Sequence, residues 1–204
     1  MKIAIICDDF PSEGRPVYVF VEQLANELAR QNVEIAIIAP QSLTRHFVRH
    51  VPLMPKKVVV ENGNHPYVVY RPYSLSLGNS SGWIVKQLEK IRFCGIKKCL
   101  KDFGNDLDAI YGHFWHNAYV AREYAYQNNI PMFVACGEGD NAIEHLVDRM
   151  TDDEKDKFVG AVKGVISVST ENKRQCINFG LANANNIVVL PNSVDQHLFT
   201  NNSN

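Results

Sequence analysis

The chain has 204 residues, of which 46% are hydrophobic and 21% are charged, and its formal net charge at pH 7 is −1. These values are ordinary for a soluble globular protein and allow one large domain, or two small ones, around a sizeable core. The near-neutral charge gives no indication of a nucleic-acid partner, and no run approaches the roughly 20 apolar residues that a membrane span needs.

The chain opens with the pattern of strand, loop, helix and strand. The run Lys2–Cys7 is short, apolar and rich in β-branched residues, which is typical of a strand covered on both faces. Apolar residues spaced three and four apart then predict one face of a helix, and they are Val17, Phe20, Val21, Leu24, Ala25 and Leu28. The run Val33–Pro40 predicts a second buried strand, which completes the unit that builds parallel sheets.

The middle of the chain is less regular. Residues 56–73 read as two short strands about the Asn62-Gly63 turn. Residues Trp83–Phe103 are predicted to be helical, although Gly95 weakens the helical pattern.

The alternation of strands and helices then resumes. Strands are predicted at Leu107–His113, Ile130–Cys136, Gly164–Ser169 and Asn186–Pro191. Helices are predicted at Asn117–Asn128, Glu154–Val162 and Thr170–Phe179, the last with Ser169 or Thr170 as its N-cap. The order predicts a doubly wound α/β domain, a mostly parallel, Rossmann-like sheet with helices on both faces. Ligands of such sheets bind outside the carboxyl ends of the strands, so residues that follow strands are the candidates for function.

Charge is spread unevenly along the chain. Residues 42–101 contain eleven Lys or Arg and two Glu, so this segment carries +9 and the rest of the chain −10. Such asymmetry suggests that one region meets an anionic partner. Four lysines share one side of the predicted helix, and they are Lys86, Lys90, Lys97 and Lys101. Together with Trp83 and Phe93 they predict contact with an anionic membrane surface, the alternative being a solvated helix face.

The cysteines and the N-terminus indicate a compartment. The five cysteines are odd in number and include no CxxC pair, so reduced thiols are expected. The first ten residues have too short an apolar run for a signal peptide, and two acids follow it. We therefore expect a cytoplasmic protein, with membrane contact, where it occurs, at the inner face.

Four motifs occur in a fixed order along nearly the whole chain. They are "DDFPSEGRPVYVFVEQLANELARQNVEIAIIAP", "LDAIYGHFWHNAYVA", "VACGEGD" and "GVISVS…NFG…NIVVLPNSVDQHLF". As a set they resemble the N-terminal domain of the retaining glycosyltransferases of family 4, which have the two-domain GT-B fold. The third motif stands where the family has Thr-x-His-Gly-x-Asp, and the fourth is similar to its Pro-Asn-Gly-Val-Asp…Phe signature.

The resemblance implies a division of the chain and an activity. Residues 1–195 would be the acceptor-side, Rossmann-like domain, and residues 196–204 the start of an interdomain linker, expected to be disordered. The donor-binding domain is expected to be absent from this chain, which alone would be inactive. The implied reaction is transfer of a hexose, with retention, from a nucleotide sugar to a glycan or lipid-linked acceptor, as in polysaccharide assembly. No metal or other cofactor is implied.

The resemblance and the positions after strands together give the candidate site residues. For the donor phosphate they are Gly14 and Arg15, in a loop that runs into a helix N-terminus, where free N–H groups favour anions. For the acceptor and sugar they are His113, Trp115, His116, Gly137, Glu138 and Asp140. His113 is expected on the acceptor side, Trp115 to stack on a sugar, and Glu138 and Asp140 to accept hydrogen bonds from sugar hydroxyls.

Two further residues are assigned to structure and not to chemistry. Asn192 and Asp195 are expected to shape the linker turn. No zinc site is predicted, because two histidines without further ligands do not make one. For each candidate the alternative is an ordinary strand-end or loop residue.

Departures from the family pattern keep a second hypothesis open. Gly14 stands alone where the family often has two glycines, and Cys136 replaces a histidine thought to position the donor sugar. Ser193 replaces the usual glycine of the linker turn. The alternative hypothesis is that the chain is a non-catalytic sugar-binding or regulatory domain of the same fold. A phosphorelay receiver would need a Lys after the last strand, and a nicotinamide-binding domain would need G-x-G-x-x-G after the first, which "CDDFPSEG" lacks.

Overall fold

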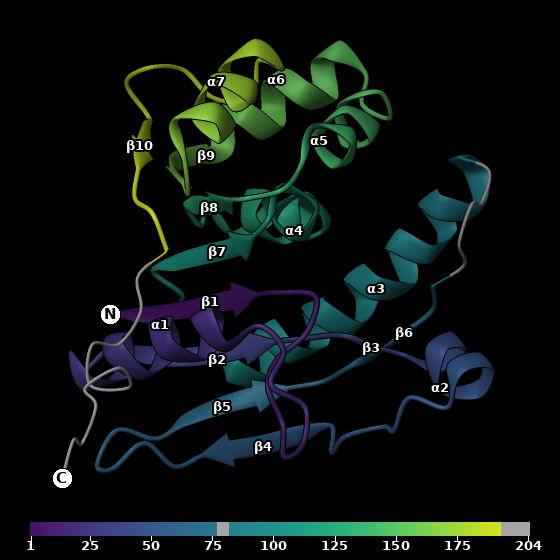
Figure 1. The fold of residues 1–204 in the computed structure, drawn as a ribbon, viewed down its shortest axis with the longest axis vertical. Coiled ribbons are helices and arrows are strands. Elements are labelled where there is room, and N and C mark those ends of the chain that lie inside the picture. Colours follow the sequence, from purple (N-terminus) through teal and green to yellow (C-terminus); the bar gives the residue numbers. More distant parts are fainter. Residues whose placement is uncertain (77–81, 193–204) are drawn as a thin grey trace, which may run out of the picture.

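The structure is a computed structural model that describes residues 1–76 and 82–192 (Figure 1). Its strands are β1 (Lys2–Ile6), β2 (Glu34–Ile38), β3 (Gln41–Ser42), β4 (Lys57–Val60), β5 (Tyr67–Tyr70), β6 (Tyr73–Ser74), β7 (Ala109–His113), β8 (Met132–Cys136), β9 (Val162–Ser167) and β10 (Ile187–Val189). Its helices are α1 (Val19–Arg30), α2 (Leu43–Arg49), α3 (Gly82–Phe103), α4 (Trp115–Asn128), α5 (Asp140–Val147), α6 (Asp152–Ala161) and α7 (Thr170–Asn178). The predictions for Ser193, Asp195 and residues 196–204 lie outside the described residues.

Eight strands form one sheet in the order β10-β9-β8-β7-β1-β2-β5-β4. Each neighbouring pair is parallel except β4 with β5, and in Figure 1 the arrow of β4 points opposite to that of β5. From β1 the chain runs to β2, then out to β4 at the edge and back to β5, and it later crosses to β7 on the other side of β1. The predicted doubly wound, mostly parallel Rossmann-like sheet is confirmed, and its topological switch point lies between β1 and β7.

Helices cover both faces of the sheet, as predicted, but unevenly. Among the described residues, α1 packs through Val21, Ala25 and Ala29 on a core with Ile5 and Ile37. The other core takes its residues from α3, α4, α5, α6 and α7. Alternate strand residues face the two cores, because successive side chains of a strand point to opposite faces. None of the helices in the described ranges is both long and apolar enough to cross a bilayer.

The N-terminus of α4 lies unusually close to β7. A Cβ atom added at Gly112 would lie 2.5 Å from Ala118 Cβ and 2.6 Å from the Ala118 backbone nitrogen. Such distances do not occur between real atoms, so only glycine fits at this position of the strand. The contact fixes where β7 ends and α4 begins, which is the turn that carries His113 and Phe114.

Several elements differ from the sequence-based expectation. Helix α1 begins at Val19 and not at Val17, after Tyr18 in a left-handed conformation. Helix α5 is not among the predicted helices, and α6 begins at Asp152 and not at Glu154, after a capping box formed by Thr151 and Glu154. The β4–β5 pair about Asn62-Gly63 is antiparallel, as predicted.

Candidate functional site

The candidate site lies at the carboxyl ends of β1, β7 and β8, where the sheet has its switch point. Asp8 and Asp9 follow β1, His113 ends β7, and the loop from Gly137 follows β8. The Phe114 N–H donates to the Ala135 carbonyl at 2.8 Å, which joins the ends of β7 and β8. The structure therefore brings the histidine and the acidic loop to one edge of the sheet.

His113 is a buried, neutral histidine, with 7% of its surface exposed. Its ring lies among those of Phe114, Phe20 and Tyr18, with centroids 4.3, 4.9 and 5.9 Å away. Both ring nitrogens are buried and lack a hydrogen-bond partner within the described ranges. Burial lowers the pKa of His113 to about 4, against an opposing effect of Asp8. A native polar side chain left unpaired in this way marks a candidate for function.

The two residues that precede α1 and α4 have strained backbones. Tyr18 has a φ of 56° and Phe114 a φ of 76°. Bulky residues rarely adopt positive φ, and each such conformation costs roughly 1–3 kcal/mol. Their rings are 6.2 Å apart, so the strain is concentrated at the switch point. Strain that packing maintains in this way is typical of functional sites.

Glu138 holds the loop after β8 to the start of α4. Its Oε1 accepts the Trp115 N–H at 2.6 Å, and its Oε2 accepts the Gly137 N–H at 3.2 Å. Phe114, the N-cap of α4, provides no side-chain bond, so Glu138 performs the capping from a neighbouring loop. Burial raises the pKa of Glu138, while the backbone hydrogen bonds oppose that rise. Asp140 is exposed, at the first position of α5.

The prediction that Trp115 stacks on a sugar is wrong. Its indole is fully buried, packs against Phe158 with ring centroids 6.0 Å apart, and directs Nε1 at Cys176 Sγ, 3.4 Å away. Because α4 begins at Trp115, the side chain points into the helix layer and away from the sheet edge. The thiol of Cys136 is also buried, 3.2 Å from that of Cys176, so it cannot touch a sugar.

His116 lies toward α3. Its Nδ1 is 3.8 Å from Glu89 Oε1, an oxygen that also binds Arg149 at 2.8 Å. Burial, together with the positive charge of Arg92, lowers the pKa of His116 to about 4. His116 and His113 are therefore both neutral at pH 7, but they lie in different surroundings.

A chain of hydrogen bonds joins β1, α3 and α4, and the sequence reasoning did not find it. Arg92 Nη2 lies 2.7 Å from Asp8 Oδ1 and 2.6 Å from Asn117 Oδ1. Asn117 in turn donates to the His113 carbonyl at 2.5 Å. Burial raises the pKa of Asp8, but the charge and hydrogen bond of Arg92 outweigh it and hold that pKa below its usual range.

The loop before α1 forms a tight turn. Ser12 and Arg15 exchange two backbone hydrogen bonds, of 2.9 and 3.2 Å, and Gly14 between them has a φ of 71°. No atom lies within 4 Å of an added Gly14 Cβ, so the turn requires glycine for its conformation and not for close contact. The Arg15 guanidinium pairs with Asp9. The predicted phosphate role of this loop stays a prediction.

Within the described ranges, no three His, Cys, Asp or Glu side chains are grouped closely enough to hold a metal ion. Asn192 is exposed and is the last residue described, so its predicted role in the turn stays a prediction.

Comparison with solved structures shows what the fold is similar to. Sucrose-phosphate synthase from Thermosynechococcus elongatus matches in two structures, with TM-scores of 0.63 and 0.61 at 14% and 13% identity. The two matches cover 98% and 97% of this chain, and 93% and 49% of the respective synthase chains. Anabaena HepE in complex with UDP and glucose matches with a TM-score of 0.57 at 15% identity, over 98% of this chain and 46% of its own. This chain thus spans about half the length of the second and third structures.

At these identities the likeness shows the fold, which is that of one half of a GT-B glycosyltransferase. A search of curated proteins found no significant match. A family model described as Glycosyltransferase Family 4 matches residues 17–198, which is most of the chain and includes both strained helix starts. The chain therefore belongs to glycosyltransferase family 4.

Proposed function

We propose that this chain forms the acceptor-side half of a nucleotide-sugar-dependent glycosyltransferase that transfers a hexose with retention to a glycan or lipid-linked acceptor. The observation that carries the proposal is the family match over residues 17–198. The HepE structure contains UDP and glucose, which supports a nucleotide-sugar donor for a protein of this fold.

Glycosyl transfer needs a donor diphosphate held in place, stabilisation of the departing phosphate, and an acceptor hydroxyl near the anomeric carbon. From this half, the N-terminus of α1 has no side-chain cap, so its free N–H groups favour an anion. The Gly14-Arg15 turn lies just before it.

The described side chains also bear on where the acceptor proton goes. His113 is a weak base, with its pKa near 4, and the Glu138 oxygens already accept backbone N–H groups. Neither is suited to act as a general base at pH 7. This supports a retaining reaction in which the departing phosphate takes the acceptor proton.

We further propose that the donor's base, ribose and most of its phosphate are bound by a second domain, so that this half alone is inactive. The test begins with the coding sequence downstream of Asn204, which we expect to encode a second α/β domain containing a Glu-x7-Glu pattern. Transfer from UDP-glucose and other nucleotide sugars is then measured for the 204-residue chain and for the chain extended by that domain. Transfer by the extended protein, but not by the 204-residue chain, supports the proposal. If neither protein shows transfer or hydrolysis of the donor, the proposal is contradicted.

The alternative is a non-catalytic sugar-binding or regulatory domain of the same fold. The buried Cys136 thiol, at the end of β8, and the buried Trp115 indole, just after β7, favour it, because neither side chain is able to touch a sugar. A stop codon directly after Asn204, with sugar binding but no transfer, is the outcome that this alternative predicts.

We propose a cytoplasmic location with contact at the inner face of an anionic membrane, through α3. The indole of Trp83 is 71% exposed, and Lys86, Lys90 and Lys101 are exposed on the same side of the helix. An aromatic ring with neighbouring lysines suits a surface of anionic headgroups.

A further inference from the structure

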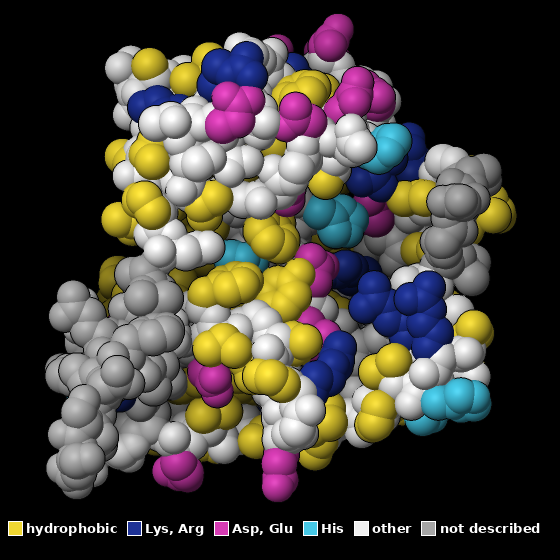
Figure 2. Space-filling model, in the orientation of Figure 1, with side chains coloured by type: hydrophobic (Ala, Val, Ile, Leu, Met, Phe, Trp, Pro, Cys, Tyr) yellow, Lys and Arg dark blue, Asp and Glu magenta, His cyan; other side chains and the backbone are white. Residues whose placement is uncertain are grey.

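A polar pocket of about 260 Å³ lies beside the carboxyl ends of β1 and β2, and its lining includes Asp8 and Tyr18 but not His113. Figure 2 shows Lys and Arg side chains gathered between the loop after β1 and helix α2, the region where this pocket opens. Its walls come from the loop after β1, from α2, from residues 51–54 and from the chain around β6. The volume suits a small polar group.

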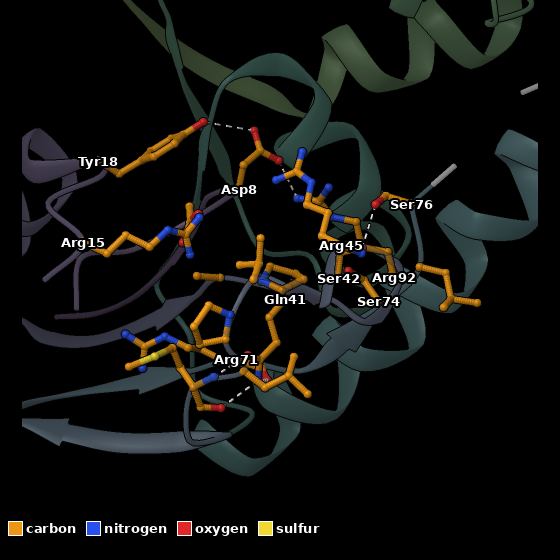
Figure 3. Close-up of a pocket in the computed structure, with 18 residues that line it drawn as sticks. Asp8, Arg15, Tyr18, Gln41, Ser42, Arg45, Arg71, Ser74, Ser76 and Arg92 are labelled. Carbon is orange, nitrogen blue, oxygen red and sulfur yellow. Dashed lines mark hydrogen bonds and ion pairs between the residues drawn. The ribbon is translucent and has the colours of Figure 1, made fainter. Parts of the chain in front are cut away.

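The pocket is lined by four arginines and two aspartates, and by no Lys, Glu or His, so its lining carries +2. Figure 3 shows Arg15 on one side and Arg45 with Arg92 on the other. Asp9 pairs with Arg15 and Asp8 with Arg92, which balances two of the charges. Within the described part of the chain, neither remaining arginine, Arg45 or Arg71, forms an ion pair with a carboxylate.

Arg71 is the more informative of these two, since it is only 7% exposed. Its single side-chain hydrogen bond among the described residues is from Nη2 to the Pro11 carbonyl, at 3.2 Å. Burial lowers the pKa of Arg71, against an opposing effect of Asp9. Arg92 has a fully buried Nε with no partner in the described ranges, whereas no nitrogen of Arg71 is both fully buried and unpartnered there. A buried guanidinium without a full set of acceptors is costly, and an anion bound beside it removes that cost.

The pocket is also held in shape before any ligand arrives. Gln41 donates to the carbonyls of Met54 and Arg71 at 2.9 and 3.1 Å and accepts the Met54 N–H at 2.9 Å, which joins two walls. The Ser42 and Ser76 hydroxyls, both in the lining, lie 2.7 Å apart. Preformed donors of this kind lower the cost of ordering a site when it binds.

We propose that this pocket binds the phosphate group of a phosphorylated acceptor, an inference that rests on the proposed function. A phosphomonoester carries about −1.5 to −2 at pH 7, close to the opposite of the lining's charge. Guanidinium groups suit it because they bind phosphate oxygens in pairs. The phosphate belongs either to a soluble sugar phosphate or to a lipid headgroup, and the recognition chemistry is the same for both.

The test measures binding to the 204-residue chain by titration calorimetry. The soluble probes are glucose 6-phosphate, inorganic phosphate, glucose and glucuronate. The lipid probe is phosphatidylcholine vesicles with and without phosphatidic acid, competed with glucose 6-phosphate. Arg45→Gln and Arg71→Gln are compared with Arg49→Gln, which removes an exposed charge from the same helix α2 outside the pocket lining.

We expect a phosphate-bearing probe to bind, glucose and glucuronate to bind more weakly, and Arg45→Gln and Arg71→Gln each to weaken binding about tenfold or more. Arg49→Gln should leave it unchanged. If the buried Arg71→Gln variant fails to fold, the exposed Arg45 position still decides the matter. Stronger binding of glucose 6-phosphate points to a soluble acceptor, and stronger binding of phosphatidic acid to a lipid-linked one.

The inference is overturned if no phosphate-bearing probe binds, if glucuronate binds as tightly, or if Arg45→Gln and Arg49→Gln have equal effects. The outcomes separate it from the proposed function. Transfer by the extended protein without phosphate binding removes this inference only. Phosphate binding without transfer by the extended protein removes the proposed function, and leaves a phosphate pocket whose ligand is not an acceptor.

Discussion

Replacing Gly112 by alanine tests how the structure positions the site. Gly112 lies in the middle of the sheet, in β7, and its added Cβ would lie 2.5 and 2.6 Å from the side chain and backbone nitrogen of Ala118. Backbone atoms cannot rotate away as a side chain does. Either α4 shifts from β7 or the strand bends, and each would move the His113-Phe114 turn.

The expected cost follows from these distances. Overpacking a core by one methyl group costs typically 1–3 kcal/mol, and contact with backbone places this case at the upper end. Replacing a glycine in a strand by alanine regains about 0.5–1 kcal/mol of stability, because glycine loses more conformational entropy on folding. We expect Gly112→Ala to lower the free energy of unfolding by about 2 kcal/mol, which for a chain of this length lowers Tm by roughly 4–8 °C.

Urea unfolding followed by tryptophan fluorescence measures this, because the buried Trp115 indole reports on the start of α4. The matched control is Gly160→Ala in α6, where no atom lies within 4 Å of an added Cβ. Alanine there should be neutral or stabilise by up to about 1 kcal/mol. Full stability of Gly112→Ala, or equal losses in both variants, would refute the proposed contact between β7 and α4.

Three further predictions concern pH and the membrane. The lowered pKa of His113 makes the native state resist protonation, so the free energy of unfolding falls as pH drops from about 6.5 towards 4. In urea titrations, His113→Phe should therefore lose less of this free energy than the wild type between about pH 7 and pH 5. An equal loss contradicts this. The lowered pKa of Asp8 contributes stability that is present above its unfolded pKa and lost as pH falls through the folded one. Because the Asp8 side chain is 39% exposed, Asp8→Asn should cost only about 1 kcal/mol at neutral pH, in the same titrations, and a difference that persists in strong acid counts against the ion pair. Sedimentation with anionic vesicles at low salt should recover the wild type but less of Trp83→Ala and Lys86→Glu, and absence of wild-type binding removes the membrane proposal.

The sheet could be predicted from sequence because its strands are continuous apolar runs, such as Lys2–Cys7 and Val33–Pro40. Helix α2 could not, since it is short and buries none of its residues, which leaves no periodic apolar pattern to detect. The break between α5 and α6 was readable in principle. The sequence Thr151-x-x-Glu154 is a capping-box pattern, and it marks the start of the second helix.

The site could be predicted less well, because its contacts join distant parts of the chain. The sequence places Asp8 after a strand, but nothing local shows that Arg92, 84 residues later, pairs with it. Trp115 was misplaced for a geometric reason. A residue just after a strand is expected at the sheet edge, but here the helix begins at once and turns the indole into the core. The four pocket arginines are likewise spread from Arg15 to Arg92.

The carboxylate of Glu138 has a mechanical consequence. One of its oxygens is bonded to the first residue of α4 and the other to its own loop after β8, so the ends of two strands share one clasp. A displacement of either strand end would break the hydrogen bond to α4 and leave the half-buried Glu138 carboxylate without that partner. We therefore expect the loop after β8 and the start of α4 to move together as one rigid unit. Adjustment to different ligands is then left to the turn between Pro11 and Pro16.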